Sequence, residues 1–187
     1  MANEKVMDQV ILGLLQHESL TGYEIKKRID TVLRFFWNAS FGSIYPTLNQ
    51  LETAGCVTKE QIAGSGRNKI LYTITDAGRI RLEEWLRQPV QKDELRYETL
   101  LKLFFGAGTE KNVAIEHIDR FEAKVKASLP FLEGSVQELR GILDASEDHT
   151  YYLLTALFGV NLYNASLDWC AQARKILEAA QTSKDSQ

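Results

Sequence analysis

Apolar residues near the start of the chain recur every three or four positions, as they do in amphipathic helices. A first helix is predicted by Met7, Val10, Ile11, Leu14 and Leu15. A second helix begins at Thr21, whose hydroxyl can accept a hydrogen bond from a backbone N–H while Glu24 reaches back to the Thr21 N–H, which is a capping box. Its buried side is predicted to carry Ile25, Ile29, Val32 and Leu33.

A third helix follows the break at Phe41-Gly42-Ser43. We expect Ser43 to cap it and Pro46 to lie in its first turn, where the missing N–H of proline costs little. Ile44, Leu48 and Leu51 fall on one side and predict the buried face. Gly55 is expected to end the helix in the left-handed conformation.

The period then changes from 3.6 to 2, which indicates strands. Val57 to Ile62 and Lys69 to Ile74 are predicted to form a hairpin around a turn at Ala63 to Gly66, and Ile70, Tyr72 and Ile74 share one face. Thr75 is expected to cap a fourth helix that packs back through Ile80, Leu82, Trp85 and Leu86. Residues 1–88 are therefore predicted to form a winged helix-turn-helix with a two-stranded wing.

Residues 89–187 predict a separate, mainly α domain made of a long antiparallel helical hairpin. The first helix is expected to start at Thr109, and Pro130 and Gly134 mark a point where it kinks or divides. Its apolar or small positions are Ala114, Ile118, Phe121, Val125, Leu129, Leu132, Val136, Leu139 and Leu143. A turn at Ser146 to Asp148 leads into a second series, Tyr151, Thr155, Phe158, Leu162, Ala165, Trp169, Ala173, Ile176 and Ala180.

The last helix predicts self-association. Leu153, Val160 and Leu167 lie near the face opposite Phe158, so the helix is apolar almost all round and must be covered on two sides. One partner helix cannot cover both sides. We therefore expect a two-fold homodimer, in which two copies of the third helix reach successive major grooves of DNA.

The composition adds charge to this picture. The 187 residues carry 22 Lys and Arg against 25 Asp and Glu, a net charge of -3, which on average is not that of a nucleic-acid-binding protein. Between Lys26 and Arg81, however, nine basic residues face four acidic ones. The N-terminus lacks the apolar stretch of a secretory signal and no run is long enough to span a bilayer, so we expect a cytoplasmic protein with Cys56 and Cys170 reduced.

The third helix offers the candidate DNA contacts. With Ile44, Leu48 and Leu51 inward, the exposed face carries Tyr45, Pro46, Asn49 and Gln50. Asn and Gln can bond adenine in the major groove, and the start of the helix near Ser43 favours a phosphate oxygen. Arg67 and Lys69 flank the hairpin turn, where they can reach the DNA backbone or the minor groove, or can simply protect a sheet edge as solvated charges.

Several motifs resemble the PadR family of bacterial transcriptional regulators: Thr21-Gly22-Tyr23-Glu24-Ile25, Gly42 to Glu52 with its Ser-Ile-Tyr-Pro-x-Leu segment, Gly55, and Tyr72 to Gly78. The resemblance covers Val6 to Leu86, and the second half is similar to the longer members, which carry a helical dimerisation domain like that of virulence activator A. It implies a homodimer on a partly palindromic operator, with the third helix in the major groove. The wing departs from the family because Ala63 to Asn68 is rich in glycine and less basic.

The resemblance and the residues together give the predicted site. The candidate DNA contacts are Thr21, Tyr23, Lys26, Ser43, Tyr45, Pro46, Asn49, Gln50, Arg67 and Lys69. The candidate dimerisation or effector residues are Tyr151, Tyr152, Phe158, Asn161, Leu162, Tyr163 and Trp169. This second set forms either a dimer core or a mixed pocket. Because the family includes members similar to a phenolic-acid-responsive repressor, the resemblance implies an aromatic or amphipathic effector, and we expect repression rather than activation.

The sequence lacks the motifs that are typical of metal-binding proteins, cofactor-binding proteins and enzymes. His17, His117 and His149 have no metal-ligand spacing, and the chain has no phosphate-binding loop or nucleophile motif, so we expect no metal, no cofactor and no enzyme. Two alternatives remain. One is a winged helix that binds only proteins, and the other is a cofactor-free enzyme that uses the aromatic region of the second half.

Overall fold

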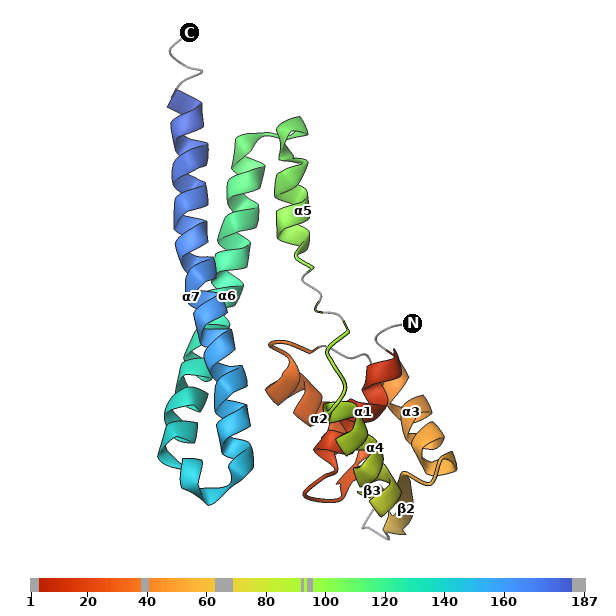
Figure 1. The fold of residues 1–187 in the computed structure, drawn as a ribbon. Coiled ribbons are helices and arrows are strands. Elements are labelled where there is room, and N and C mark those ends of the chain that lie inside the picture. The colour runs from red at the N-terminus through yellow and green to blue at the C-terminus, as the bar shows by residue number, and fades with distance from the viewer. Residues whose placement is uncertain (1–3, 38–40, 63–68, 92, 94–95, 183–187) are drawn as a thin grey trace. The chain divides into compact units, whose positions relative to one another are not determined.

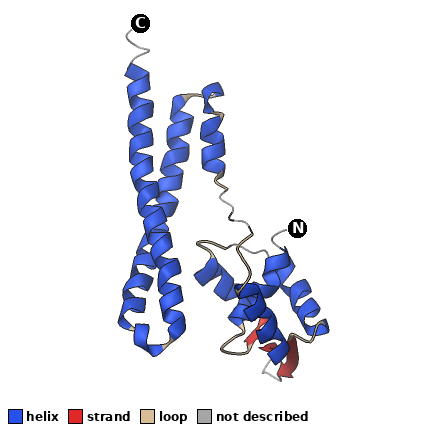
Figure 2. Ribbon diagram, viewed as in Figure 1, coloured by secondary structure: helices blue, strands red, loops and turns tan. Residues whose placement is uncertain are grey.

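The structure is a computed structural model that describes residues 4–37, 41–62, 69–91, 93 and 96–182 (Figure 1). Its contacts divide the chain into two compact units, Met1–Asp93 and Glu94–Gln187. Helices dominate both units, and the strands belong to the first (Figure 2). Each unit is described by itself.

The first unit is a winged helix-turn-helix. Its elements are α1 (Glu4–Leu14), β1 (Leu20–Thr21), α2 (Gly22–Arg28), the π-helical turn η1 (Ile29–Leu33), α3 (Phe41–Thr53), β2 (Val57–Ile62), β3 (Lys69–Ile74) and α4 (Asp76–Leu86). The strands form an antiparallel sheet in the order β1-β3-β2, with Val57 opposite Ile74 and Leu20 opposite Tyr72. The predicted two-stranded wing was thus incomplete, because β1 adds a third strand by pairing with β3.

One apolar core joins these elements. It contains Met7, Ile11, Leu12, Leu15, Leu20, Ile25, Ile29, Ile44, Leu48, Leu51, Cys56, Val57, Tyr72, Ile74 and Leu82. Helices α1, α2, α3 and α4 and all three strands contribute to this core. The position of α3 is therefore set by apolar contacts rather than by its own short sequence.

The predicted caps of α2 and α4 are confirmed. Thr21 and Glu24 form both halves of the capping box, and the Thr75 hydroxyl accepts a hydrogen bond from the Gly78 N–H. The hydrogen bond from the Thr21 backbone N–H lowers the pKa of the Glu24 carboxyl. Gly55 has the predicted left-handed conformation, with φ of 69°. These local signals predicted the element boundaries because each one satisfies backbone groups that a helix end exposes.

Two predictions were wrong, one about where α3 starts and one about which residues just after α2 are buried. α3 begins at Phe41, so Ser43 is not its cap and Pro46 lies inside the helix rather than in its first turn. Val32 is 57% exposed instead of buried, because Ile29–Leu33 is π-helical and its wider turn moves side chains off the 3.6-residue stripe.

The packing of α4 was also predicted too broadly. Leu82 is buried, whereas Ile80, Trp85 and Leu86 are exposed. Ile80 lies two residues from the core-facing Gly78 and so points to the other side of the helix, while Trp85 and Leu86 lie in the last turn.

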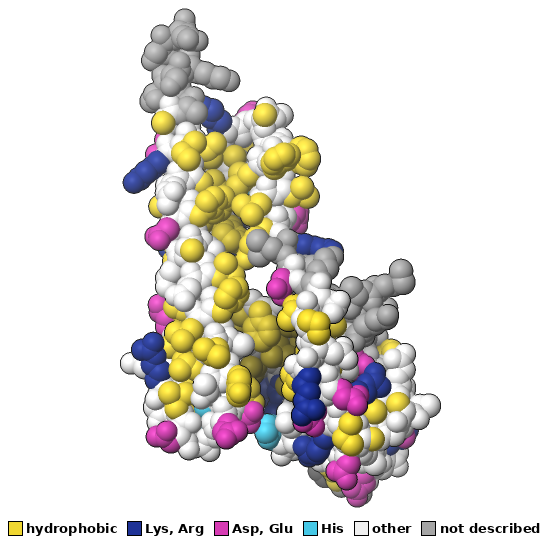
Figure 3. Space-filling view, viewed as in Figure 1, with side chains coloured by type: hydrophobic (Ala, Val, Ile, Leu, Met, Phe, Trp, Pro, Cys, Tyr) yellow, Lys and Arg dark blue, Asp and Glu magenta, His cyan; other side chains and the backbone are white. Residues whose placement is uncertain are grey.

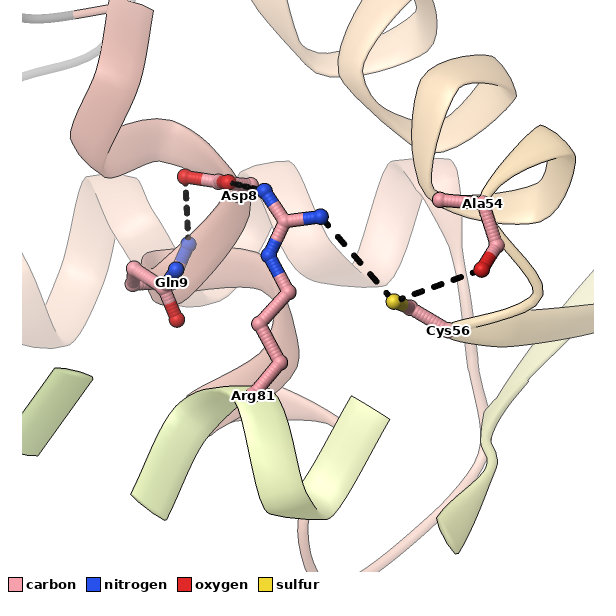
Figure 4. Close-up of polar contacts among 5 residues, drawn as sticks. All are labelled: Asp8, Gln9, Ala54, Cys56 and Arg81. Carbon is pink, nitrogen blue, oxygen red and sulfur yellow. Dashed lines mark hydrogen bonds and ion pairs between the residues drawn. The ribbon is translucent and has the colours of Figure 1, made fainter. Parts of the chain in front are cut away.

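A polar contact fixes α4 against α1. Arg81 of α4 extends between Asp8 of α1, with which it forms an ion pair, and the thiol of Cys56 at 4.0 Å (Figure 4). The Cys56 thiol in turn faces the Ala54 carbonyl at 3.8 Å. The closing helix is thereby tied to the first helix and to the turn that leaves α3.

The second unit is a long helical hairpin. It comprises α5 (Glu98–Phe104), the turn η2 (Gly106–Gly108), α6 (Lys111–Gly141), the turn η3 (Leu143–Ala145) and α7 (Glu147–Thr182), with α6 and α7 antiparallel (Figure 1). The cap of α6 is Glu110 rather than Thr109, and the helix is not divided at Pro130 or Gly134. The connection comes slightly earlier than predicted, because α7 already begins at Glu147.

The two long helices meet through small and apolar residues. Ala114, Ile118, Val125 and Leu132 of α6 are buried, and Cys170 of α7 is fully buried. A Cβ atom at Gly159 would lie 3.1 Å from Leu132 Cδ1, so α7 approaches α6 closely there. Burial raises the pKa of the Cys170 thiol. The predicted stripe on α7 lies largely outside this contact, because Tyr151, Phe158 and Ile176 are 67%, 63% and 68% exposed.

Alanine substitutions at two glycines are expected to change the free energy of unfolding in opposite directions. A Cβ atom at Gly78 would lie 2.2 Å from the Cys56 carbonyl oxygen, whereas a Cβ at Gly13 of α1 would meet nothing within 4 Å. We expect Gly78→Ala to lower the free energy of unfolding by about 3 kcal/mol through overpacking. Gly13→Ala is expected to raise it by about 0.5–1 kcal/mol through helix propensity. Urea unfolding of both variants measures this, and equal effects would contradict the packing described for α4.

Candidate nucleic-acid interface

One side of α3 is buried in the core, and the opposite side exposes polar residues. Ile44, Leu48 and Leu51 turn inward and are 0%, 0% and 1% exposed. The exposed residues on the other side, here called the outward face, are Gly42, Tyr45, Pro46, Asn49, Gln50 and Thr53. The core therefore orients the face that the sequence predicted, and it leaves the side-chain amides of Asn49 and Gln50 accessible.

Thr53 and Ala54 extend this surface beyond the predicted residues. They line a shallow depression of about 370 Å³ together with Asn49 and Gln50. The Thr53 hydroxyl donates to the Asn49 carbonyl at 2.9 Å, and the residue is exposed. The signal for Thr53 was present in the sequence, because it lies four residues after Asn49 and hence one turn further along the same side.

Ser43 and Tyr45 have partners within the unit. Ser43 is half-buried, and its carbonyl accepts a hydrogen bond of 2.7 Å from the Thr47 hydroxyl. The Tyr45 ring lies against Gly22 at the start of α2, where a Cβ atom would be only 2.8 Å from Tyr45 Cε1. Tyr45 is nevertheless 48% exposed. It thus contributes to the contact between α2 and α3 while part of its ring remains accessible.

The predicted residues of α2 differ in availability. Thr21 is occupied by the cap, since its N–H and its hydroxyl both lie 2.8 Å from Glu24 Oε2. Lys26 forms an ion pair with Asp30, and its side chain is only 13% exposed. Tyr23, by contrast, is 66% exposed. Of these three side chains, Tyr23 is therefore the one presented to solvent.

The wing is only partly described. Lys69 opens β3 and is exposed, and its charge helps to lower the pKa of Glu24, after the hydrogen bonds from Thr21. Arg67 and the turn predicted at Ala63 to Gly66 lie outside the described residues. The wing-tip contacts therefore stay a prediction.

Acidic side chains hold many of the cations in this unit. Among the described basic residues from Lys26 to Arg81, ion pairs join Lys26 with Asp30, Arg28 with Glu18, Lys59 with Glu52, and Arg81 with Asp8. Arg79 donates to the Gln16 carbonyl at 2.9 Å. The excess of basic residues counted along the sequence thus overstates the positive charge that DNA would meet.

The predicted dimerisation or effector residues do not come together in one pocket. Tyr151 and Trp169 lie on one helix, and eighteen residues at 1.5 Å each separate them by about 27 Å. Tyr152 and Asn161 are exposed like Tyr151 and Phe158, whereas Leu162, Tyr163 and Trp169 are half-buried. Trp169 packs edge-to-face on Phe121, with 5.9 Å between ring centroids, and Phe121 packs similarly on Tyr97. The set forms an exposed stripe with a partly covered aromatic end.

A cleft of about 450 Å³ lies elsewhere in the second unit, between α5, η2 and α6. Leu101, Phe105, Val113 and Ala114 form much of its wall, and Lys102 and His117 supply its charged or titratable groups. Lys102 is also paired with Glu98 at 2.9 Å. The sequence reasoning missed this cleft, because its walls come from two helices joined by a turn that periodicity does not predict.

Neither a metal-binding cluster nor a membrane-spanning helix is found among the described residues. No three His, Cys, Asp or Glu side chains in that part of the chain are grouped as a metal ion would require. Within the same ranges, no helix combines the length and hydropathy of a membrane span.

Comparisons with known proteins give the family. Residues 11–84 match the transcriptional regulator PadR-like family, and residues 95–178 match the virulence activator alpha C-terminal family. The negative transcriptional regulator PadR of Bacillus subtilis is 32% identical over 157 residues, which cover 80% of this chain and 86% of that protein.

Solved structures agree with this assignment. Bacillus subtilis PadR in complex with operator DNA has a TM-score of 0.77 at 30% identity, covering 92% of this chain and 99% of that one. The same protein in complex with p-coumaric acid has a TM-score of 0.69 at 29% identity, with the same coverage. The winged helix, the helical second unit and these matches show that the chain belongs to the PadR-like family of DNA-binding transcriptional regulators.

Proposed function

We propose that this protein is a homodimeric transcriptional repressor that binds a partly palindromic operator with α3 in the major groove, and that a small aromatic effector releases it. The observation that carries the proposal is the outward face of α3, which the buried Ile44, Leu48 and Leu51 hold toward solvent. It is supported by the relative that was solved with operator DNA. Repression is supported by the name of the Bacillus subtilis relative, a negative regulator.

Each exposed residue of α3 suits a particular DNA contact. Asn49 and Gln50 can each form two hydrogen bonds with an adenine edge, and the Thr53 methyl can contact the methyl group of thymine. Tyr45 and Ser43 lie nearer the start of the helix, where a phosphate oxygen is favoured. Tyr23 and Lys69 are exposed on neighbouring elements and suit contacts with the DNA backbone.

Selection from a random pool of DNA duplexes tests the operator. We expect the wild-type protein at physiological salt to enrich a partly palindromic sequence. Asn49→Ala should then weaken binding to that sequence roughly 5- to 100-fold, since a bidentate base contact contributes about 1–3 kcal/mol of discrimination. Gln137→Ala, which removes an exposed amide from α6, is the control and should bind like the wild type. A pool that remains random would contradict sequence-specific binding.

The homodimer is supported by the stripe on α7. At 100° per residue, Tyr151, Phe158 and Ile176 lie within about 20° of one another. All three are more than three-fifths exposed, and further exposed hydrophobic residues lie on α5, among them Phe104 at 81%. Figure 3 shows hydrophobic side chains gathered on the surface of the long helices. Large apolar side chains exposed along one side of a helix suit contact with another protein surface. A second copy would cover this stripe and would supply the second α3 that a palindrome needs.

Substitution in the stripe tests the dimer. Phe158→Glu places a charge on the exposed surface, so it should leave the monomer folded but convert a dimer at micromolar concentration into a monomer. Analytical ultracentrifugation measures the mass, with Gln137→Glu as the control that adds the same charge to α6. A wild-type protein that is already monomeric at this concentration would contradict the proposal.

The effector is supported by the relative solved with p-coumaric acid and by the cleft between α5 and α6. The apolar walls at Leu101, Phe105 and Val113 suit an aromatic ring, and Lys102 and His117 suit a carboxylate. This cleft replaces the aromatic residues of α7 as the proposed effector site, because those residues are spread along one helix.

Titration with p-coumaric acid tests the effector and its site together. We expect the acid to weaken operator binding by the wild-type protein and to change its tryptophan fluorescence. Val113→Trp fills the cleft, so in this variant the acid should no longer weaken operator binding, while operator affinity without the acid stays unchanged. The response of this variant is read from DNA affinity alone, because the new tryptophan changes the fluorescence. Unaltered fluorescence and DNA affinity in the wild type would rule out this class of effector, and a normal response in Val113→Trp would rule out the cleft.

A further inference from the structure

An ion pair joins the wing to the DNA-binding helix. Lys59 Nζ of β2 lies 2.6 Å from Glu52 Oε2 of α3, and the two side chains are 46% and 32% exposed. The hydrogen bond to Glu52 raises the pKa of Lys59. Lys59 is therefore charged and engaged by its own protein, although its position on the wing would suit a DNA contact.

The ion pair lies beside the outward face of α3. Glu52 follows Asn49 by three residues and Tyr45 by seven, so all three side chains emerge from neighbouring positions on the same side of the helix. A duplex that meets Asn49 would bring its phosphates close to this flank. There the Glu52 carboxylate repels phosphate and also occupies the cation that would attract it.

We propose that Glu52 holds Lys59 away from the DNA backbone and thereby limits the sequence-independent part of DNA binding. The inference rests on the proposed function and makes Glu52 a specificity-determining residue that acts through charge. With Lys59 occupied, phosphate contacts contribute less to affinity, and the hydrogen bonds from the outward face of α3 contribute a larger share. The negative net charge of the chain agrees with this, because overall attraction to DNA is weak.

The physical basis is that the negative charge of Glu52, rather than the shape of its side chain, holds the Lys59 ammonium. Glu52→Gln keeps the shape of the side chain but removes its charge, so the Lys59 ammonium becomes available to a phosphate oxygen. Each additional phosphate contact releases a counterion, which steepens the dependence of the binding constant on salt. The effect is independent of DNA sequence, so it can be measured without knowing the operator.

The experiment measures binding to a non-operator duplex by fluorescence anisotropy, with the full-length protein, between about 50 and 200 mM KCl. Glu52→Gln is expected to tighten this binding roughly 3- to 10-fold at the lowest salt. The slope of log K against log salt should become more negative by about 0.9 for each new phosphate contact. Thermal unfolding checks that the variant is folded.

Two variants separate this mechanism from a general charge effect. Glu60→Gln removes the same charge from an exposed residue next to Lys59, but successive side chains of a strand point to opposite faces, so it should change the binding much less. Lys59→Gln alone should weaken non-operator binding only slightly, because it removes no phosphate contact and merely leaves the Glu52 carboxylate without its partner. Added to Glu52→Gln, it should restore the wild-type slope.

Three results would overturn the inference. They are equal effects of Glu52→Gln and Glu60→Gln, a gain in binding that survives the addition of Lys59→Gln, and a large loss of binding from Lys59→Gln alone. Each of these leaves the proposed function standing, provided that the wild-type protein still enriches one DNA sequence. Failure of the proposed function is a separate outcome, seen as a wild-type protein that enriches no sequence.

Discussion

The burial of one side of α3 is the constraint on which the DNA-binding unit depends. Ile44, Leu48 and Leu51 are almost completely buried in the common core, and each such side chain contributes about 1.5–3 kcal/mol. A rotation of the helix by one residue would expose part of this apolar surface and would bury an amide without a hydrogen-bond partner. The orientation of Asn49 and Gln50 is therefore a consequence of the core, and their availability for DNA follows from it.

Several basic side chains of the first unit form ion pairs within the protein, where they connect its elements, and are less available to bind DNA. The ion pair between Arg81 and Asp8 joins α4 to α1, and the ion pair between Lys59 and Glu52 joins β2 to α3. Both pairs leave fewer cations for DNA. A monomer with so little available positive charge would bind DNA weakly. In the proposed dimer, two copies would double the number of DNA contacts, and the exposed apolar stripe on the second unit would hold the two copies together.

Local signals in the sequence predicted much of the fold, and long-range geometry explains what they missed. The local signals are the hydrophobic periodicity, the caps at Thr21 and Thr75, and the left-handed Gly55. Each depends only on residues that are close together in the sequence. The strand β1 is only two residues long and exists through its pairing with β3, and Val32 is displaced by a π-helical turn. The exposed amides of α3 were predicted because their orientation follows from the period, whereas the engagement of Lys26 and Lys59 required three-dimensional positions.

The central claim is that the outward face of α3 contacts the bases of an operator. The most direct test places a photoreactive amino acid at Asn49 and, in a second variant, at Glu84, an exposed residue of α4. We expect crosslinks from position 49 to bases within each half of the enriched duplex, and none from position 84. Crosslinks from α4 with none from α3 would contradict this claim.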